Sequence, residues 1–468
     1  MDFPVFHLDF FGNRLLIAVI ASIHVLINHM LAVGAIPLIA WLEWRGIRTG
    51  DLRWDRLAYR LLVVCFIVTT SLGALTGVGI WLSTSLVNPS AIGSLIRVFF
   101  WAWFFEWTVF AAEVVLIVIY TLSWQSDWAR RRKRTHLALG VLLAVNSWLT
   151  MAVIVAILGF QMDTGIWTAQ PGFWTAVLNP LYLPQLAFRT PFALVTAGLL
   201  MLMLAGFFTR GDREFRDRAV RAISGWTLVF CLPWFAGAWA YWRAIPEATQ
   251  GNIPIALTTL AFQHYLGPLQ FLIFASVAAV VLLGVWGAAA PRRLPAALLI
   301  VPAVLAVWQL SYFERVREFI RKPDVIQGYM HANALRPVDY PLYAEDGLLA
   351  HAVYTPVREV TEDNRLAAGR EMFRLTCSRC HTTHGVNSVV QKFGAMYGWQ
   401  EWDPEIMRLY LGSMHNTRPF MPPVPGTADE HAALVDYVIA LRRDPAGLHG
   451  AQTAGAAGRD RLPAAGTD

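Results

Sequence analysis

The residues best suited to chemistry are Cys377, Cys380 and His381, which form the pattern Cys-x-x-Cys-His. This is the attachment motif of c-type haem, in which two thiols bind the haem covalently and the adjacent histidine binds the iron. A zinc half-site and a redox dithiol are the alternatives. The other cysteines, Cys65 and Cys231, lie in distant apolar segments and cannot complete a zinc site with a second Cys pair. The sequence therefore predicts one covalent haem c.

A methionine further along the chain is the expected sixth ligand of this iron. Met421 lies between prolines in the segment 419–423, and prolines restrict the backbone of the loop. A thioether opposite a histidine raises the reduction potential of a haem. Met414 and His415 are its rivals for this position. The other histidines of the region are predicted to be surface residues: His384 and His431.

Composition places most of the chain in a membrane. Of the 468 residues, 56% are hydrophobic and 15% are charged, whereas soluble domains carry about 25% charged residues. Twenty Trp and 27 Phe fit aromatic belts and cofactor pockets. The net charge of +6 comes with arginines clustered in short loops, so they are interpreted as topology signals and no nucleic-acid partner is predicted. The N-terminus lacks the pattern of a cleavable signal peptide.

Eight apolar segments are long enough to cross a bilayer, for which about 20 residues are needed. They lie at residues 14–43, 57–83, 95–124, 137–160, 190–209, 220–243, 266–290 and 294–313. The connections 44–56, 125–136, 210–221 and 291–293 are basic, and 84–94, 161–189 and 244–265 carry few basic residues. The positive-inside rule then places the N-terminus outside. Eight crossings return the C-terminus to the same side, where haem c is attached.

The predicted fold class is all-α, with a polytopic membrane helix bundle followed by a small helical cytochrome c domain. We expect a membrane domain at 1–330, a linker at 331–362, the soluble domain at 363–445 and a disordered tail at 446–468. The stretch from residue 314 to 362 is expected to be a polar connector. The last helix of the soluble domain should begin at Thr427, three residues before Glu430, because this is a capping-box pattern.

Ionisable residues inside membrane spans are costly and usually functional. His24 and His29 lie in the first span, five residues apart, so they point about 140° away from each other on a helix and are not expected to share one iron. A hydrogen bond between helices is the alternative for either one. Glu106 and Glu113 lie on one face of the third span and suit a proton path or a haem ligand, with a structural hydrogen bond as the alternative.

A charged segment, residues 314–323, follows the last span. It is either a basic helix end in water or the source of a carboxylate ligand, with arginines that bind haem propionates.

These motifs together resemble subunit I of the cytochrome bd-type oxygen reductases over about residues 10–330. Arg14 and His24 resemble that family's first helix, in which the histidine binds an active-site haem. Glu318-x-x-Arg321-x-Pro323 resembles the motif that supplies a carboxylate ligand to a second active-site haem. Further matches resemble the family's second to fifth helices: 73–77 (Gly-x-x-Thr-Gly), Glu106 with Glu113 at a spacing one residue shorter, Asn146, and 178–180 (Leu-Asn-Pro).

The chain also departs from the family pattern. Arg189 stands where the family has a histidine ligand of a low-spin haem, and the seventh span lacks the partner methionine between residues 266 and 285. The short segment 244–265 replaces the long quinol-binding loop. The chain therefore resembles divergent bd-like branches that lack the quinol loop and carry c-type haem. His29 and His264 are the candidate ligands of a relocated third haem.

The resemblance implies a terminal oxidase in the bacterial cytoplasmic membrane, with the N-terminus and the cytochrome c domain on the periplasmic side. Electrons would come from soluble cytochrome c or another periplasmic donor, and oxygen would be reduced to water. Two or three non-covalent haems, b or d, and a second membrane subunit are implied. His24 and Glu318 would bind the haem pair, and Glu106 and Glu113 would handle protons.

Two other functions are compatible with the same residues. One is an electron conduit that links a periplasmic dehydrogenase to the respiratory chain through low-spin haems, without oxygen chemistry. Paired axial histidines, such as His29 and His264, would favour it. The other is an assembly subunit whose bundle has lost its haems, which the retained His24, Glu113 and Glu318 argue against.

Overall fold

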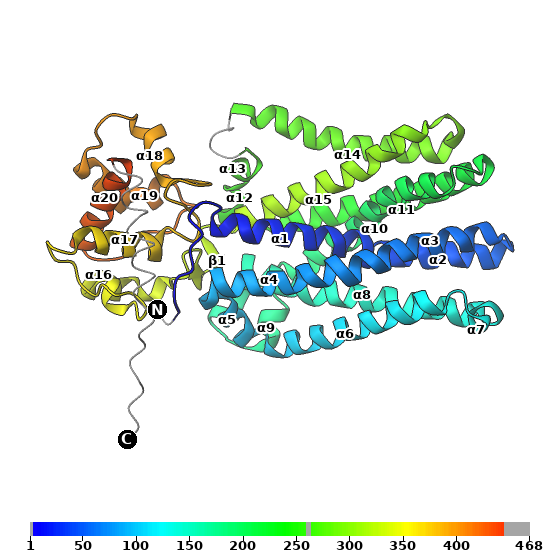
Figure 1. The fold of residues 1–468 in the computed structure, drawn as a ribbon, viewed down its shortest axis with the longest axis horizontal. Helices are drawn as coiled ribbons and strands as arrows, with labels where there is room; N and C mark the ends of the chain where they lie inside the picture. The colour runs from blue at the N-terminus through cyan, green and yellow to red at the C-terminus, as the bar shows by residue number, and fades with distance from the viewer. Residues whose placement is uncertain (1–2, 259–263, 444–468) are drawn as a thin grey trace, which may run out of the picture. The chain divides into compact units, whose positions relative to one another are not determined.

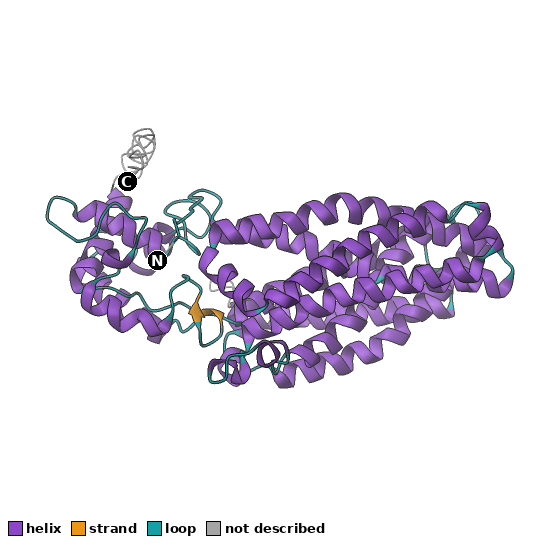
Figure 2. Cartoon of the chain, turned by 90° about the horizontal axis from the view of Figure 1, so that it is seen from below, coloured by secondary structure: helices purple, strands orange, loops and turns teal. Residues whose placement is uncertain are grey.

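The computed structural model describes residues 3–258 and 264–443, and the expected disordered tail at 446–468 lies outside them. Most of the described chain is helical (Figure 2). Strands are limited to two short segments, β1 (Asp324–Ile326) and β2 (Met330–His331). The all-α prediction is confirmed.

Eight helical segments in the described part of the chain are long and apolar enough to cross a membrane, as predicted, and the protein is a multi-pass membrane protein. The first two spans are α1 (Asn13–Ile27), η1 (Asn28–Val33) and α2 (Ala35–Thr49), and then α3 (Leu52–Val68), η2 (Thr69–Gly73) and α4 (Ala74–Val87). The other six are α6 (Phe100–Ser123), α8 (Lys133–Met162), α10 (Tyr182–Phe208), α11 (Arg213–Ala244), α14 (Leu266–Ala289) and η6–α15 (Ala296–Leu299 and Ile300–Ile320).

The first two spans are each interrupted by a π-helical turn. The turns are η1, which contains His29, and η2, which ends at Gly73. A π turn inserts an extra residue into a helix and re-aims the side chains that follow it, and such turns are frequent at functional sites. No proline or other residue pattern marked these two turns in the sequence.

Small residues let the central helices of the bundle approach closely. α10 lies along α11 in the bundle (Figure 1). A Cβ atom at Gly198 would collide with the hydroxyl group of Thr227, and one at Gly237 would collide with the carbonyl group of Ala187. Close approach of this kind is a common source of helix association in lipid, where the hydrophobic effect does not drive helices together.

The chain divides into two compact units. The membrane unit comprises Val19–Leu82 and Ala91–Tyr329, and the C-terminal unit comprises Met1–Ala18, Ser83–Ser90 and Met330–Asp468. The main helices of the C-terminal unit are α16 (Tyr340–Asp346), α17 (Arg365–Thr376), α18 (Val389–Tyr397), α19 (Pro404–Thr417) and α20 (Ala428–Arg443). The smaller elements of the chain are α5 (Pro89–Val98), α7 (Asp127–Arg131), η3 (Gly165–Thr168), α9 (Phe173–Val177), α12 (Glu247–Gln250), α13 (Ile253–Thr258), η5 (Pro291–Arg293), η7 (Pro337–Asp339) and η8 (Leu349–His351).

The segment expected to be a linker, 331–362, packs into the core of the C-terminal unit. Leu348 lies in the same buried cluster as Phe373 of α17 and Tyr437 of α20. The predicted capping box at the start of α20 is present, because Thr427 Oγ1 accepts from the amide of Glu430 and the Glu430 carboxylate accepts from the amide of Thr427. The same carboxylate accepts from the amide of Leu348, which ties the expected linker to α20.

The expectation of a connector starting at residue 314 was wrong, because α15 continues to Ile320. Glu314 and Arg317 are 8% and 9% exposed, respectively. They remain inside the bundle because they pair with each other, with Arg317 Nε 2.9 Å from Glu314 Oε2. Hydropathy alone ended this span at residue 313, seven residues before the end of α15, because it treats buried ion pairs as loop residues.

Candidate functional site

The ring of His24 is held in one orientation by the second span. Its Nδ1 atom lies 3.2 Å from the carbonyl oxygen of Gly73 and 3.2 Å from Thr76 Oγ1. The Thr76 hydroxyl already donates to the carbonyl of Leu72, so both neighbours of Nδ1 act as acceptors. Nδ1 must therefore carry the proton, and Nε2 is left with the lone pair that an iron ligand needs.

The Gly-x-x-Thr-Gly segment is what shapes this position. Gly73 supplies the carbonyl at the end of η2, and Thr76 supplies the hydroxyl. A Cβ atom at Gly77 would lie 3.2 Å from His24 Cε1, closer than side chains normally approach, so glycine makes room for the ring. His24 is only partly buried, so a cofactor could reach Nε2.

The two carboxylates of α6 lie on one face of the helix, about 10 Å apart along its axis at about 1.5 Å per residue. Glu113 is held by α8, where Ser147 Oγ donates to one carboxylate oxygen at 2.6 Å and Thr150 Oγ1 donates to the other at 3.3 Å. The Asn146 amide donates to the carbonyl of Val109 and fixes the two helices together. Sequence analysis missed Ser147 and Thr150, although their spacing of three residues places them on one face of a helix.

An aromatic contact joins the His24 side of the bundle to α6. The rings of Trp81 on α4 and Trp103 on α6 are 4.7 Å apart. Trp103 lies one turn before Glu106 on α6, and Thr76 lies on the same helix as Trp81. The elements that hold His24 and the carboxylate pair are therefore neighbours.

At the end of α15, Glu318 is surrounded by cationic side chains. Arg321 Nη2 lies 2.6 Å from its carboxylate, Lys322 Nζ lies at 3.7 Å and Arg317 Nη2 at 3.9 Å. The Glu318 side chain is 38% exposed, whereas that of Arg321 is 8% exposed and also donates to the carbonyl of Val325. The carboxylate is thus ionised and accessible, and both properties suit a metal ligand.

A second polar cluster lies in the bundle around Arg189, which stands where the family has a histidine. This arginine is 1% exposed, and its Nη2 atom lies 2.7 Å from Glu314 Oε1. Its Nη1 atom donates to His29 Nε2 at 2.9 Å. Arg317 completes the cluster through Glu314. Sequence analysis did not pair these residues because three different spans contribute them.

Aromatic side chains pack around this cluster. Arg189 lies 5.0 Å above the ring of Phe313. Phe188 and Phe313 are 4.7 Å apart, and Phe192 stacks on Trp234 at 5.2 Å. The region is filled with the chain's own side chains.

In the C-terminal unit, the loop after the Cys-x-x-Cys-His motif orients His381. Its Nδ1–H group donates to the carbonyl of Asn387 at 3.0 Å, which leaves Nε2 available for iron. Asn387 has a φ of +60°, and its side-chain Nδ2 atom donates to the carbonyl of Cys380 at 2.8 Å. Burial lowers the pKa of His381 to about 4, with smaller contributions from the charges of Lys392 and Arg14, so the ring is neutral at neutral pH. Cys377 and Cys380 are free thiols, as haem attachment requires.

The N-terminal residues form part of this haem-attachment loop, which the sequence did not indicate. The Asp9 carboxylate accepts from the amide of Thr383 at 2.8 Å and from its hydroxyl at 2.6 Å. The amide of Val386 donates to the carbonyl of Phe10 at 2.9 Å. Arg14, predicted to serve a haem of the bundle, belongs to the C-terminal unit and acts electrostatically on His381.

The loop that carries Met421 is held by His415, one of the other candidates for the sixth iron ligand. His415 Nδ1 donates to the carbonyl of Met421 at 2.7 Å, and the amide of Met421 donates to the carbonyl of Arg418. His415 therefore positions the loop through its backbone, and Met421 keeps a free thioether. His384 and His431 are partly buried and hydrogen-bonded to backbone carbonyls, so they are more than simple surface residues.

Residues 13–243 match the family model of cytochrome bd terminal oxidase subunit I. The fold of the chain is similar to a chain in the structure of bd oxidase from Geobacillus thermodenitrificans, with a TM-score of 0.56 and 18% identity over 69% of this chain and 90% of that chain. No relative was found among curated proteins.

The match to the bd oxidase family covers the first six spans. It includes His24, Glu106, Glu113 and Arg189, whereas Glu318 and the whole Cys-x-x-Cys-His region lie beyond it. Over residues 13–243, just under half of the chain, the sequence is therefore similar to subunit I of this family, and the similarity implies haems held within the bundle. The part of the C-terminal unit that begins at Met330 lies outside the match.

The residues of the bundle fit some of these haems and not others. His24, with its protonated Nδ1 and accessible Nε2, fits an axial ligand. His29 does not fit through its Nε2 atom, because Arg189 donates a hydrogen bond to that atom. His264 is exposed, and the structure does not bring it to the His29 cluster. The two candidate ligands of a third haem, His29 and His264, therefore do not form a ligand pair for a low-spin haem in the described part of the chain.

Proposed function

We propose that this protein is a subunit of a bd-like terminal oxidase whose electron donor is a soluble cytochrome c, or another periplasmic protein, rather than quinol. The orientation of His24 carries the proposal. A histidine whose Nδ1–H group is fixed by a backbone carbonyl and whose Nε2 atom is accessible is the arrangement of a metal ligand. The family match to subunit I over the same span supports it.

Each side chain of the site has a role that its contacts support. His24 would bind one haem iron through Nε2, and the Glu318 carboxylate would bind another, with Arg321 holding it in place. These haems would supply the electron transfer and the reduction of oxygen to water. Glu113 would take up and release a proton at its Oε1 atom, which accepts a hydrogen bond from Ser147 Oγ. Glu106 would relay protons along the same face of α6.

Haem c would be held by Cys377, Cys380, His381 and Met421. The fixed Nδ1–H group of His381 and the His415-bound loop of Met421 support this assignment. We propose that this unit and the N-terminus lie on the periplasmic side and that a second membrane subunit completes the enzyme. Arginine-rich connections at the opposite ends of the spans support this orientation.

A visible spectrum of the dithionite-reduced complex, with and without carbon monoxide, tests the proposal together with a pyridine haemochrome assay. We expect a c-type signal and a large carbon monoxide shift from non-covalent haem, because His24 leaves one side of its iron open. A c-type signal without a carbon monoxide shift would overturn the oxidase and support the electron conduit. The engagement of His29 by Arg189 already weighs against the paired axial histidines of that conduit.

A further inference from the structure

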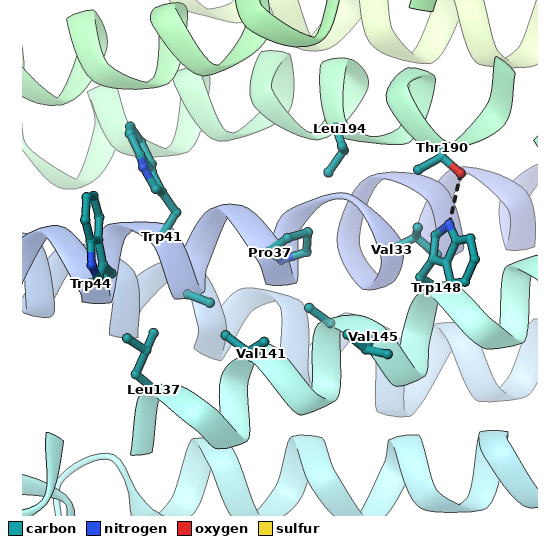
Figure 3. Close-up of a pocket in the computed structure, with 12 residues that line it drawn as sticks. Val33, Pro37, Trp41, Trp44, Leu137, Val141, Val145, Trp148, Thr190 and Leu194 are labelled. Atoms are coloured by element: carbon teal, nitrogen blue, oxygen red, sulfur yellow. Dashed lines mark hydrogen bonds between the residues drawn. The ribbon is translucent and has the colours of Figure 1, made fainter. Parts of the chain in front are cut away.

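An apolar groove runs along the membrane unit between α2, α8 and α10 (Figure 3). It has a volume of about 490 Å³. Its lining is almost wholly apolar and includes three tryptophans: Trp41, Trp44 and Trp148. The hydrogen bond from Trp148 Nε1 to Thr190 Oγ1, at 2.9 Å, lies at one end of the groove, and Trp44 and Leu137 lie at the other (Figure 3).

The length of the groove corresponds to one leaflet of a bilayer. The wall formed by η1 and α2 extends from Val33 to Trp44, which is roughly 16 Å at about 1.5 Å per residue. Half of the hydrocarbon core of a bilayer is about 15 Å thick. The groove can therefore hold one extended acyl chain that enters from a single membrane surface.

The groove reaches the membrane surface that carries the basic connections. Trp44 and Leu137 are at the same level, because the neighbouring Glu43 and His136 are 2.6 Å apart. At this end of the groove, the last turns of α2, up to Thr49, lie within the basic connection 44–56. Likewise, α8 begins at Lys133, within the basic connection 125–136. The positive-inside rule assigns such connections to the cytoplasmic side, where the leaflet is rich in anionic lipid.

Each wall of the groove continues into an exposed arginine at this end. Arg48 lies one turn beyond Trp44 on α2, and its guanidinium group is 5.2 Å from the Trp44 ring. Arg134 lies one turn before Leu137 on α8. Neither arginine forms an ion pair with the residues that the structure describes.

The acidic side chains nearest to this end do not cancel these two charges. The Glu43 carboxylate is fully buried and faces His136 and Lys133, at 2.6 and 3.6 Å. Asp55 pairs with Lys133 at 2.5 Å. Arg48 and Arg134 are thus exposed cationic groups left over at this end of the groove. Arg45, which is partly buried with its guanidinium group 5.0 Å from the Trp41 ring, also forms no ion pair with the described residues.

We propose that the groove binds an acyl chain of an anionic phospholipid of the cytoplasmic leaflet, with the lipid phosphate between Arg48 and Arg134. The apolar walls recognise the chain, and the two arginines recognise the headgroup. A transmembrane helix of a partner subunit is the competing occupant, but it would not require a pair of cations at one end. The proposal does not depend on the redox chemistry of the protein.

Native mass spectrometry of the delipidated complex tests this binding. Dioleoylphosphatidylglycerol and dioleoylphosphatidylcholine are added separately, since they share acyl chains and differ in charge. The test variant is Arg48→Gln with Arg134→Gln, and the control is Arg131→Gln, an exposed arginine of the same basic connection that lies on neither wall. Ala144→Phe fills the groove without a change in charge.

We expect the wild-type complex to retain phosphatidylglycerol in preference to phosphatidylcholine. Each arginine should contribute roughly a fivefold difference in affinity, so the double variant should lose roughly 25-fold for phosphatidylglycerol alone. Ala144→Phe should weaken both lipids, and Arg131→Gln should weaken neither. Equal retention of the two lipids, or a double variant that binds as the wild type does, would overturn the proposal. So would a complex that takes up neither lipid, because a partner helix would then fill the groove.

Discussion

Arg189 Nη1 donates a hydrogen bond to His29 Nε2 across 2.9 Å and so joins α10 to the π-helical turn of the first span. An arginine has no acceptor atom, so the bond fixes Nε2 of His29 as the acceptor. The same guanidinium group forms an ion pair with Glu314, and Arg189 is the only charged residue of α10. The hydrogen bond thus occupies Nε2 of His29, one of the two ring nitrogens through which a histidine can bind iron.

Replacement of Arg189 should be strongly destabilising. Arg189→Met leaves Glu314 with Arg317 alone and removes a partner from a buried network, for which losses of about 3–5 kcal/mol are typical. Chemical unfolding of the purified protein in detergent measures the change. Arg130→Met is the control, since Arg130 pairs with Asp127 on the surface, where such a pair contributes less than about 1 kcal/mol. Equal effects of the two variants would contradict a stabilising role of the cluster.

Replacement of His24 should remove haem from the bundle without affecting haem c. In His24→Ala the ligand-binding haem signal should disappear while the c-type signal remains in the reduced spectrum. Thr76→Val should be milder, because it removes one of two acceptors of Nδ1, and loss of such a supporting contact typically costs about 10–100-fold in metal affinity. An unchanged carbon monoxide shift in His24→Ala would exclude His24 as a ligand.

The elements of the fold that depend on local sequence could be predicted. Eight apolar segments gave eight spans, and the capping box at Thr427 and Glu430 gave the start of α20. The segment 73–77 was noted in the sequence only through its family resemblance, which did not connect it with His24. The structure supplies the physical reason, since its carbonyl, hydroxyl and missing side chain all face the His24 ring.

The contacts between distant parts of the chain could not be predicted. Glu314 looked like the start of a polar connector because its partner Arg189 is 125 residues away in the sequence. The bond between Asp9 and Thr383 joins residues that are further apart still. Hydropathy and spacing describe neighbours along the chain, and a buried charge becomes understandable only when its partner is known.

Glu113 should matter for turnover through its proton rather than through the fold. Glu113→Gln keeps the size of the side chain and one oxygen that accepts from Ser147, and its NH2 group can donate to the Thr150 hydroxyl. It cannot ionise, so oxygen uptake should fall about 10²–10⁴-fold, the range for loss of a positioned acid or base. Thr108→Val is the matched control on α6, because its hydroxyl bonds only to the backbone of its own helix. Haem spectra should be unchanged in both variants. Normal oxygen uptake by Glu113→Gln would exclude a proton-transfer role.

The haem-attachment cysteines should be required for electron input alone. In Cys377→Ala with Cys380→Ala, oxygen uptake with soluble cytochrome c should stop, because haem c would no longer be attached. Dithionite should still reduce the haems of the bundle. Turnover at the wild-type rate would show that the C-terminal unit is not the site of electron input.

The bond between Asp9 and Thr383 should make the haem-attachment loop sensitive to acid. Although burial raises the pKa of Asp9, hydrogen bonds from His7 and Thr383 outweigh it and hold the pKa well below its usual value. A carboxylate with a depressed pKa stabilises the fold above its unfolded-state pKa of about 3.9, and this stability is lost as the pH falls through the folded-state value. Hydrogen exchange of the Thr383 amide, measured from neutral pH to about pH 3, should therefore show a loss of protection below about pH 4. Asp9→Asn should lack this transition and show weaker protection already at neutral pH, whereas a transition that persists in Asp9→Asn would assign it to another group.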